Sequence, residues 1–308
     1  MRNSVRILLG IILTVIQLTA IAQPKVVLVT GASKGIGKAL VLKLAESPDL
    51  YKVYGTWNTT LPDPKDFPGI TMLKMDQTRY VEIQQTVGII RKREKRLDVL
   101  VNNAGMGVYG PLELLTEKQI RKQFEINVIG PLLLMKEVLP VMRENNFGRL
   151  LNVSSLAGAV GIPMMDVYSG SKFAIEGTCA AMEGYLGVMK RSDGTPWNLS
   201  CQVVEPGYTR TEFKKGADFP GANEVPGYFS KSFQAFEKRL EEGLSRGQDP
   251  AEVAEVIKAA IDDDSGSKVF RIQTRQGVTR YLKEHYGITL DTTGASLVIR
   301  PVPVMQKK

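Results

Sequence analysis

A short apolar run that leads directly into three closely spaced glycines constrains the fold most strongly. The run reads Val26-Val27-Leu28-Val29-Thr30-Gly31-Ala32-Ser33-Lys34-Gly35-Ile36-Gly37. It is typical of a buried strand, a tight turn and the start of a helix. Glycine lets the backbone turn sharply and approach an anion, and the free N–H groups at a helix N-terminus then face that anion. The segment therefore predicts a phosphate-binding turn after the first strand.

Downstream of this turn, β-branched runs alternate with stretches of helical period, as in a parallel sheet with helices on both faces. Strands are expected at 26–30, 51–57, 70–75, 97–102, 149–153, 199–205 and 268–272. Helices are expected at 35–46, 80–91, 117–142, 166–190 and 250–261, with a capping box between Thr116 and Gln119. The pattern predicts an α/β fold, a single doubly wound Rossmann-type domain with a seven-stranded parallel sheet.

Residues 1–22 differ from the rest of the chain. Arg2 and Arg6 precede sixteen mostly apolar residues that end in Ala20-Ile21-Ala22. This layout predicts either a cleaved secretory signal or an N-terminal membrane anchor, although sixteen residues fall short of the roughly 20 that a spanning helix needs. We expect the chain in the secretory pathway or at a membrane. The Rossmann-type domain is expected at 23–290, with an irregular, aromatic loop at 209–247 that we expect to serve as a substrate loop, and a tail at 291–308.

Composition argues against several classes of chemistry. The chain has one histidine, His285, and two cysteines, Cys179 and Cys201, which we expect to be buried free thiols. We therefore expect no metal site and no Ser-His-Asp triad. The formal charge of +8 is densest at 91–96, where cations suit the C-terminal end of a helix. We expect a solvated helix end there and no nucleic-acid partner.

The glycine spacing, Thr-Gly-x-x-x-Gly-x-Gly, resembles the short-chain dehydrogenase/reductase family. Further motifs of that family follow in register over most of the chain. The resemblance implies that a nicotinamide cofactor contacts the glycine turn, an acid after the third strand, the Asn-Asn-Ala-Gly motif, the catalytic helix and the bend after the sixth strand. The residues are Gly31, Ser33, Lys34, Gly35, Ile36, Gly37, Asp76, Asn103, Ala104, Gly105, Tyr168, Lys172, Pro206, Gly207 and Thr209.

The same resemblance implies a catalytic set of Asn127, Ser155, Tyr168 and Lys172. Tyr168 and Lys172 are four residues apart and share one helix face, so the ammonium is expected to favour the tyrosinate. Ser155 is expected to bond the substrate oxygen, and Lys172 to bind ribose and relay protons through Asn127 and water. Ser154 is the alternative serine, but it comes one residue too early and would point to the opposite side.

The cofactor expected from the second strand is NADP(H). Enzymes of this fold that use NAD place an acid at the end of that strand, and here the position holds Trp57. Lys34 offers a cation for a 2′-phosphate. The chain departs from the NADP-preferring pattern at Asn58, where an arginine is common.

The stretch 161–177 is similar to 17β-hydroxysteroid and retinol dehydrogenases. The expected reaction moves a hydride between NADP(H) and a secondary alcohol, ketone or aldehyde of a lipophilic substrate. A non-catalytic NADP-binding sensor or scaffold is the alternative; an epimerase or dehydratase lacks support because its glycine spacing differs. The resemblance also implies a homodimer or tetramer formed through long helices.

Overall fold

The computed structural model describes residues 23–221, 225–263 and 271–274. Its centre is a seven-stranded sheet in the order β3-β2-β1-β4-β5-β6-β7, and every neighbouring pair is parallel. The predicted fold class is therefore confirmed. The strands are β1 Lys25–Val29, β2 Tyr51–Trp57, β3 Thr71–Lys74, β4 Val99–Asn102, β5 Gly148–Val153, β6 Leu199–Glu205 and β7 Arg271–Gln273. The chain runs outward from β1 to β3 and returns to β4 beside β1, which creates the topological switch point where ligands of such sheets bind.

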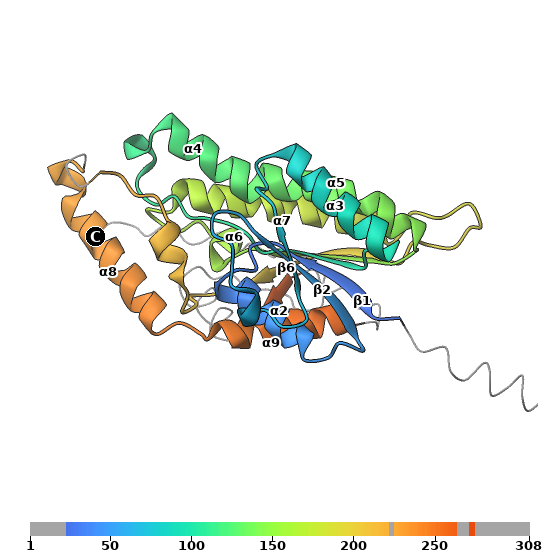
Figure 1. The fold of residues 1–308 in the computed structure, drawn as a ribbon. Helices are drawn as coiled ribbons and strands as arrows, with labels where there is room; N and C mark the ends of the chain where they lie inside the picture. The colour runs from blue at the N-terminus through green and yellow to red at the C-terminus, as the bar shows by residue number, and fades with distance from the viewer. Residues whose placement is uncertain (1–22, 222–224, 264–270, 275–308) are drawn as a thin grey trace, which may run out of the picture.

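Helices cover both faces of the sheet (Figure 1). One layer contains α3 Tyr80–Glu94, α4 Glu117–Phe124, α5 Gly130–Glu144 and α7 Asp166–Leu186. The opposite layer contains α2 Gly35–Ala45 and α9 Pro250–Asp262. The short α6 Leu156–Ala159 follows β5, and α8 Gly227–Ser245 precedes α9. Single turns of 3-10 helix occur at Pro64–Asp66, Leu112–Leu114 and Glu212–Gly216.

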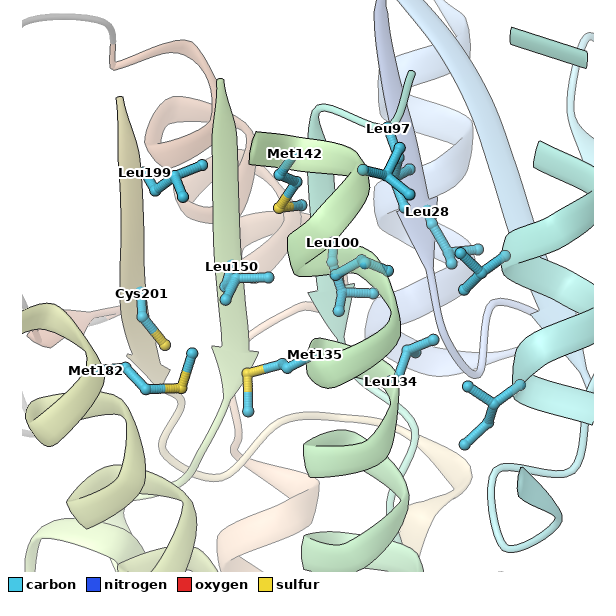
Figure 2. Packing of buried hydrophobic residues seen from close by; sticks show 14 of the residues in the cluster. Leu28, Leu97, Leu100, Leu134, Met135, Met142, Leu150, Met182, Leu199 and Cys201 are labelled. Carbon is cyan, nitrogen blue, oxygen red and sulfur yellow. The ribbon is translucent and has the colours of Figure 1, made fainter. Parts of the chain in front are cut away.

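Each helix layer encloses its own apolar core against the sheet. In the first core, Met135 and Met142 of α5 pack with Leu100 of β4 and Leu150 of β5 (Figure 2). The second core lies between the sheet and the pair α2 and α9. Cys179 and Cys201 are buried and free, as expected. Because both faces are covered, the strands carry apolar residues along their whole length.

The helix expected at 117–142 is interrupted. Thr116 and Gln119 form the predicted capping box at the start of α4. A π-helical turn then occupies Glu125–Ile129 before α5 begins at Gly130. The side chain of Asn127, inside this turn, accepts a hydrogen bond from the Met106 N–H at 2.9 Å and donates to the Met106 carbonyl at 2.8 Å. These contacts with a neighbouring loop accompany the local change of helix period.

The region 209–247 is not the irregular loop that the sequence suggested, because it contains the 19-residue helix α8. Phe233, Phe236 and Leu240 lie three and four residues apart and are buried on one face of this helix. The sequence did not predict this helix, because glycines and prolines at 216–227 precede it and are typical of a loop. α8 therefore packs as an amphipathic helix, and its apolar face reaches the cluster around Tyr168.

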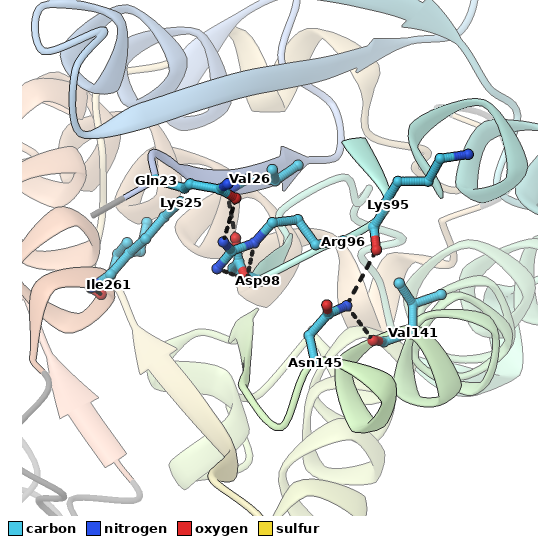
Figure 3. A network of polar contacts seen from close by, with 9 residues as sticks. All are labelled: Gln23, Lys25, Val26, Lys95, Arg96, Asp98, Val141, Asn145 and Ile261. Carbon is cyan, nitrogen blue, oxygen red and sulfur yellow. Dashed lines mark hydrogen bonds and ion pairs between the residues drawn. The ribbon is translucent and has the colours of Figure 1, made fainter. Parts of the chain in front are cut away.

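A polar network closes the amino end of the sheet (Figure 3). The buried carboxylate of Asp98 accepts hydrogen bonds from the Val26 N–H at 2.7 Å and from Arg96 Nε at 3.0 Å and Nη2 at 2.8 Å. Arg96 also donates to the Gln23 side chain. The basic stretch 91–96 follows the expected pattern, since Arg91, Lys92 and Arg93 form the last turn of α3. The network ties the start of β1 to the start of β4.

The predicted signal or anchor at 1–22, the end of the domain at 275–290 and the tail at 291–308 lie outside the described residues. Within the part of the chain that the structure describes, no helix is long and apolar enough to span a membrane. The described residues also contain no cluster of histidine, cysteine or carboxylate side chains able to hold a metal ion.

Candidate active site

A cavity of about 650 Å³ opens at the carboxyl ends of the strands. Its walls are the segments that directly follow β1, β2, β3, β4, β5 and β6, together with α7 and α8. It contains nearly all of the predicted cofactor-contacting residues, namely Gly31, Ser33, Lys34, Gly35, Ile36, Asp76, Asn103, Ala104, Gly105, Tyr168, Lys172, Pro206, Gly207 and Thr209. The fold thus gathers residues from six strand ends into one hollow.

The glycine turn forms one end of this cavity. Gly31 and Gly35 adopt left-handed φ angles of +64° and +59°, which side chains rarely tolerate. Gly37 does not line the cavity; a Cβ on it would lie 2.4 Å from the Gly31 carbonyl oxygen. At the start of α2, the N-cap Lys34 makes no side-chain capping bond, and the first turn has no acidic residue. The turn therefore fits a pyrophosphate held on the first N–H groups of α2.

The turn is braced by the loop after β4. Thr30 Oγ1 accepts hydrogen bonds from the Asn103 N–H at 3.0 Å and the Ala104 N–H at 2.9 Å. Asn103 Nδ2 donates to the Thr30 carbonyl at 2.8 Å. These hydrogen bonds give the Asn-Asn-Ala-Gly motif a structural role: it holds the end of β1 against the end of β4.

Beyond the glycine turn, Lys34, Trp57, Asn58 and Asp76 line the cavity. Asp76 Oδ1 accepts hydrogen bonds from the N–H of Thr78 at 2.9 Å and its hydroxyl at 2.8 Å. Lys34 is exposed at the glycine turn, and no acid occupies the end of β2. The arrangement leaves a cation, an indole and an amide around the position of an adenosine ribose.

The predicted catalytic side chains converge where the polar and apolar ends of the cavity meet. Ser155 follows β5 and is the N-cap of α6, and it lines the cavity together with Tyr168 of α7. Lys172 lies one turn further along α7, donates to the Val153 carbonyl at 2.8 Å and has its Nζ 5.8 Å from the Tyr168 ring centre. Asn127 is buried beside Gly105 and does not line the cavity. Serine, tyrosine and lysine thus face one space.

The other serine points elsewhere. Ser154 Oγ donates a 2.5 Å hydrogen bond to the buried carboxylate of Glu176. Ser155 therefore remains the serine that faces Tyr168, as the spacing predicted. Asn152, two residues earlier, is buried and donates to the thiols of Cys179 and Cys201, so it packs as part of β5.

Burial dominates the electrostatics of the site, contrary to the expectation that Lys172 would favour the tyrosinate. Desolvation raises the pKa of Tyr168 to about 12, and the polar side chain of Ser155, which lowers this pKa, only partly opposes the effect. Desolvation also lowers the pKa of Lys172 to about 8, against the attraction of Glu176, which raises it. At neutral pH Tyr168 is a phenol and can donate a proton, while Lys172 is an ammonium.

Aromatic and aliphatic side chains enclose the remaining end of the cavity. Tyr109 packs edge-on to Tyr168 with ring centres 5.5 Å apart, and Phe213 packs on Tyr168 at 6.2 Å. Further apolar lining residues are Met106, Ile162, Met165, Leu240 and Leu244. Sequence reasoning missed Tyr109, although it lies only four residues after the Asn-Asn-Ala-Gly motif. The phenol of Tyr168 therefore borders a predominantly apolar space.

Comparison with known proteins is consistent with this geometry. Residues 25–218 match the family model of short chain dehydrogenases. A 3-ketodihydrosphingosine reductase from Bacteroides thetaiotaomicron is 34% identical over 76% of this chain and 84% of that protein. Human 17-beta-hydroxysteroid dehydrogenase type 1 is 30% identical over 77% and 74%, and retinol dehydrogenase 8 from Bos taurus is 32% identical over 77% and 78%.

Solved structures show the same fold. A short-chain dehydrogenase from Streptomyces avermitilis superposes with a TM-score of 0.70 and 29% identity, and the match covers 85% of this chain and 92% of that one. The resemblance inferred from the motifs, including that to hydroxysteroid and retinol dehydrogenases, is thereby confirmed. The chain belongs to the short-chain dehydrogenase family, whose members are oxidoreductases that bind a nicotinamide cofactor.

Proposed function

We propose that this protein is an NADP(H)-dependent oxidoreductase that interconverts a secondary alcohol with a ketone, or an alcohol with an aldehyde, on a lipophilic substrate. The observation that carries the proposal is the position of the pair Ser155 and Tyr168, which line the same cavity as the glycine turn. The pair stands between an anion-binding glycine turn and an apolar pocket within one cavity. A cofactor in the first part and a carbonyl group in the second would meet at these two side chains.

Each catalytic side chain has a task in this reaction. Tyr168, a neutral phenol at pH 7, donates its proton to the carbonyl oxygen during reduction and receives one during oxidation. Ser155 stabilises the developing negative charge on the same oxygen. Lys172 binds the ribose hydroxyls of the cofactor and, with Asn127 and water, returns a proton to Tyr168. The bound cofactor supplies or accepts the hydride.

The glycine turn and its surroundings are proposed to hold the cofactor. Gly31, Ser33, Gly35, Ile36 and Gly37 would place the backbone and the α2 N-terminus around the pyrophosphate. Asp76 would contact the adenine, and the bend after β6 would contact the nicotinamide. The residues of the nicotinamide end are Asn103, Ala104, Gly105, Pro206, Gly207 and Thr209.

NADP(H) is proposed over NAD(H) because of the residues near the adenosine ribose. Lys34 provides a positive charge for a 2′-phosphate, and Trp57 occupies the place where an acid would repel it. An acid at that position would instead bind both ribose hydroxyls.

A lipophilic substrate is proposed because of the apolar lining of the cavity. Tyr109, Met165, Phe213 and Leu240 surround the side of Tyr168 away from the glycine turn. Pockets with this lining bind mainly through burial of apolar surface. The names of three relatives support a lipophilic class of substrate, since they refer to a ketodihydrosphingosine, a hydroxysteroid and a retinol.

Assembly is proposed to occur through the outer face of α5 and α7, as a homodimer or tetramer. This face has a mainly apolar hollow, and its lining residues are Leu132, Met135, Lys136, Leu139, Pro140, Arg143, Met182 and Tyr185. A second copy related by two-fold symmetry would cover it. Light scattering should show an oligomer that Leu139→Asp dissociates; a monomeric wild-type protein contradicts this assignment.

The N-terminal segment is proposed to direct the protein to a membrane or across one. Mass spectrometry of the mature protein distinguishes the two forms: a terminus at Gln23 indicates a cleaved signal, and an intact terminus in the membrane fraction indicates an anchor. An intact, freely soluble chain would contradict both.

The activity itself is tested by NADPH oxidation with ketones and aldehydes graded by size and polarity. We expect kcat/KM to rise with apolar size and Tyr168→Phe to abolish the turnover. Tight NADPH binding without turnover of any of these compounds would instead favour a non-catalytic sensor or scaffold.

A further inference from the structure

Three ionisable side chains from α7, β6 and β7 meet in the protein interior. Glu176 of α7, Glu205 of β6 and Arg271 of β7 have side-chain exposures of 2%, 0% and 21%. Buried charges are costly unless they are paired and hydrogen-bonded, so this arrangement needs a physical account. None of the three is among the residues that line the cavity in the described part of the chain.

The hydrogen bonds in the cluster leave one acceptor unsatisfied. Arg271 Nε donates its single hydrogen to Glu176 Oε2 at 3.0 Å, and Nη2 lies 3.0 Å from the same oxygen. Nε also lies 3.1 Å from Glu205 Oε1, but this oxygen has no hydrogen-bond partner among the described residues. Nε has no second hydrogen to offer it. A proton on Glu205 Oε1, donated to Glu176, resolves the conflict.

The resulting charge state is balanced. One proton shared by the two carboxyl groups, with the Arg271 guanidinium, makes the cluster neutral overall. Burial, followed by the charge of Glu176, raises the pKa of Glu205 to about 8, in agreement with a protonated Glu205 at neutral pH. Glu176 then carries the negative charge and forms the ion pair with Arg271.

Each acid in the cluster adjoins a part of the proposed active site. Glu176 accepts the hydrogen bond from Ser154, whose neighbour is Ser155. Glu205 immediately precedes Pro206 and Gly207. Glu176 is also one helical turn beyond Lys172, and its charge raises the pKa of that ammonium.

The hydrogen bond between Ser154 and Glu176 is tightly packed against α6. A Cβ on Gly158 of α6 would lie 2.1 Å from Glu176 Oε1 and 2.3 Å from Ser154 Oγ. The two side chains therefore occupy the space that only a glycine at position 158 leaves open.

We propose that Glu176, Glu205 and Arg271 are positioning residues that hold the ends of β5 and β6 against α7 and keep the ammonium of Lys172 charged. This inference rests on the proposed function, because it assigns Lys172 a role that requires its charge. Two effects can be separated. Arg271 provides the geometry, since it joins α7 to β6. Glu176, one helical turn along α7 from Lys172, provides a negative charge that acts on the ammonium, whose contacts are the Val153 carbonyl and the Tyr168 ring.

The charge effect is tested with NADPH titrations of the full chain across pH 6 to 10, without substrate. Affinity should fall as pH rises through the pKa of Lys172. Glu176→Gln removes the neighbouring negative charge, so we expect this fall to move to lower pH by about one unit. Glu176→Asp should keep the wild-type profile. The matched control is Glu183→Gln on the same helix, which removes a negative charge, keeps an oxygen that can accept from the Cys201 N–H and lies far along the helix from Lys172.

The geometric effect is tested with Arg271→Lys, which keeps the positive charge but cannot bond both acids in the same way. We expect kcat to fall at least ~5-fold and the pH of the affinity change to stay in place. Identical pH profiles of wild type and Glu176→Gln, or an equal shift in Glu183→Gln, would overturn the charge role. Unchanged kinetics in Arg271→Lys would overturn the geometric role. Wild-type protein that binds NADPH but reduces no carbonyl compound would contradict the proposed function alone, since the titrations need no turnover.

Discussion

Gly37 lies directly against Gly31, so that a single added carbon on Gly37 would approach the Gly31 carbonyl oxygen to 2.4 Å and Asn103 Nδ2 to 2.5 Å. One contact is with the backbone of the glycine turn and the other with a side-chain amide that donates to the Thr30 and Gly31 carbonyls, so neither atom can move without disturbing those hydrogen bonds. The turn and the loop after β4 therefore behave as one unit. The cavity end assigned to the cofactor depends on that unit.

Gly37→Ala should consequently weaken NADPH binding at least ~10-fold, worth about 1.4 kcal/mol, because the turn must open to make room. Fluorescence titration of NADPH measures the effect. Gly184→Ala is the control, since Gly184 lies in α7 and its Cβ would meet nothing within 4 Å. Equal affinities for wild type and Gly37→Ala would show that the turn is not the cofactor site.

Cofactor preference should depend on Lys34. We expect NADPH to be favoured over NADH by at least ~10-fold in kcat/KM and Lys34→Ala to remove most of that difference, because the lysine is the cation at the mouth of the turn. Trp57→Asp should shift preference toward NADH by repelling the 2′-phosphate. A wild-type enzyme that uses both cofactors equally well would rule out this role of Lys34.

Substrate preference should respond to Phe213, which packs on the ring of Tyr168. Phe213→Ala is expected to raise KM for large apolar ketones several-fold more than for small polar ones, because only the former lose buried contact area. Tyr228→Ala provides a control, since Tyr228 is an aromatic residue in α8 with 73% exposure. Parallel changes for both substrate classes would place Phe213 outside the substrate pocket.

Stability should depend on the pH at which Glu205 loses its proton. Burial raises the pKa of Glu205 from its ordinary value of 4.5 to about 8 in the folded protein, so its contribution to stability is fully present at low pH and is lost as pH rises through about 8. Between these two pKa values, the contribution of Glu205 to the free energy of unfolding changes by at most about 1.4 kcal/mol per pH unit. Glu205→Gln should flatten the dependence of Tm on pH between 5 and 8. The same slope in both proteins would show that Glu205 is ionised throughout.

Local patterns in the sequence were sufficient for the fold and for most of the site. The strands β2 and β6 begin and end where the apolar runs predicted, because both faces of this sheet are covered. The glycine turn and the spacing of Ser155, Tyr168 and Lys172 are likewise local signals, and the structure brings them to one cavity.

The features that the sequence did not reveal arise from packing between distant segments. Glu176 and Arg271 are 95 residues apart, so no spacing rule connects them. The pKa of Tyr168 rises because neighbouring elements exclude water, whereas sequence spacing showed only the nearby Lys172. Helix α8 escaped prediction because it follows a stretch rich in glycine and proline, and its buried face is defined by contacts with the cavity wall.

The most direct test of the account is the kinetics of Tyr168→Phe with NADPH and an apolar ketone that the wild-type enzyme reduces. The substitution removes only the hydroxyl oxygen, so the ring contacts with Tyr109 and Phe213 remain. We predict that kcat falls at least ~100-fold while the Kd for NADPH stays within a few-fold of wild type, because the phenol acts on the substrate oxygen and Lys172 holds the ribose. Turnover at a rate close to wild type would remove Tyr168 from the mechanism and contradict the account.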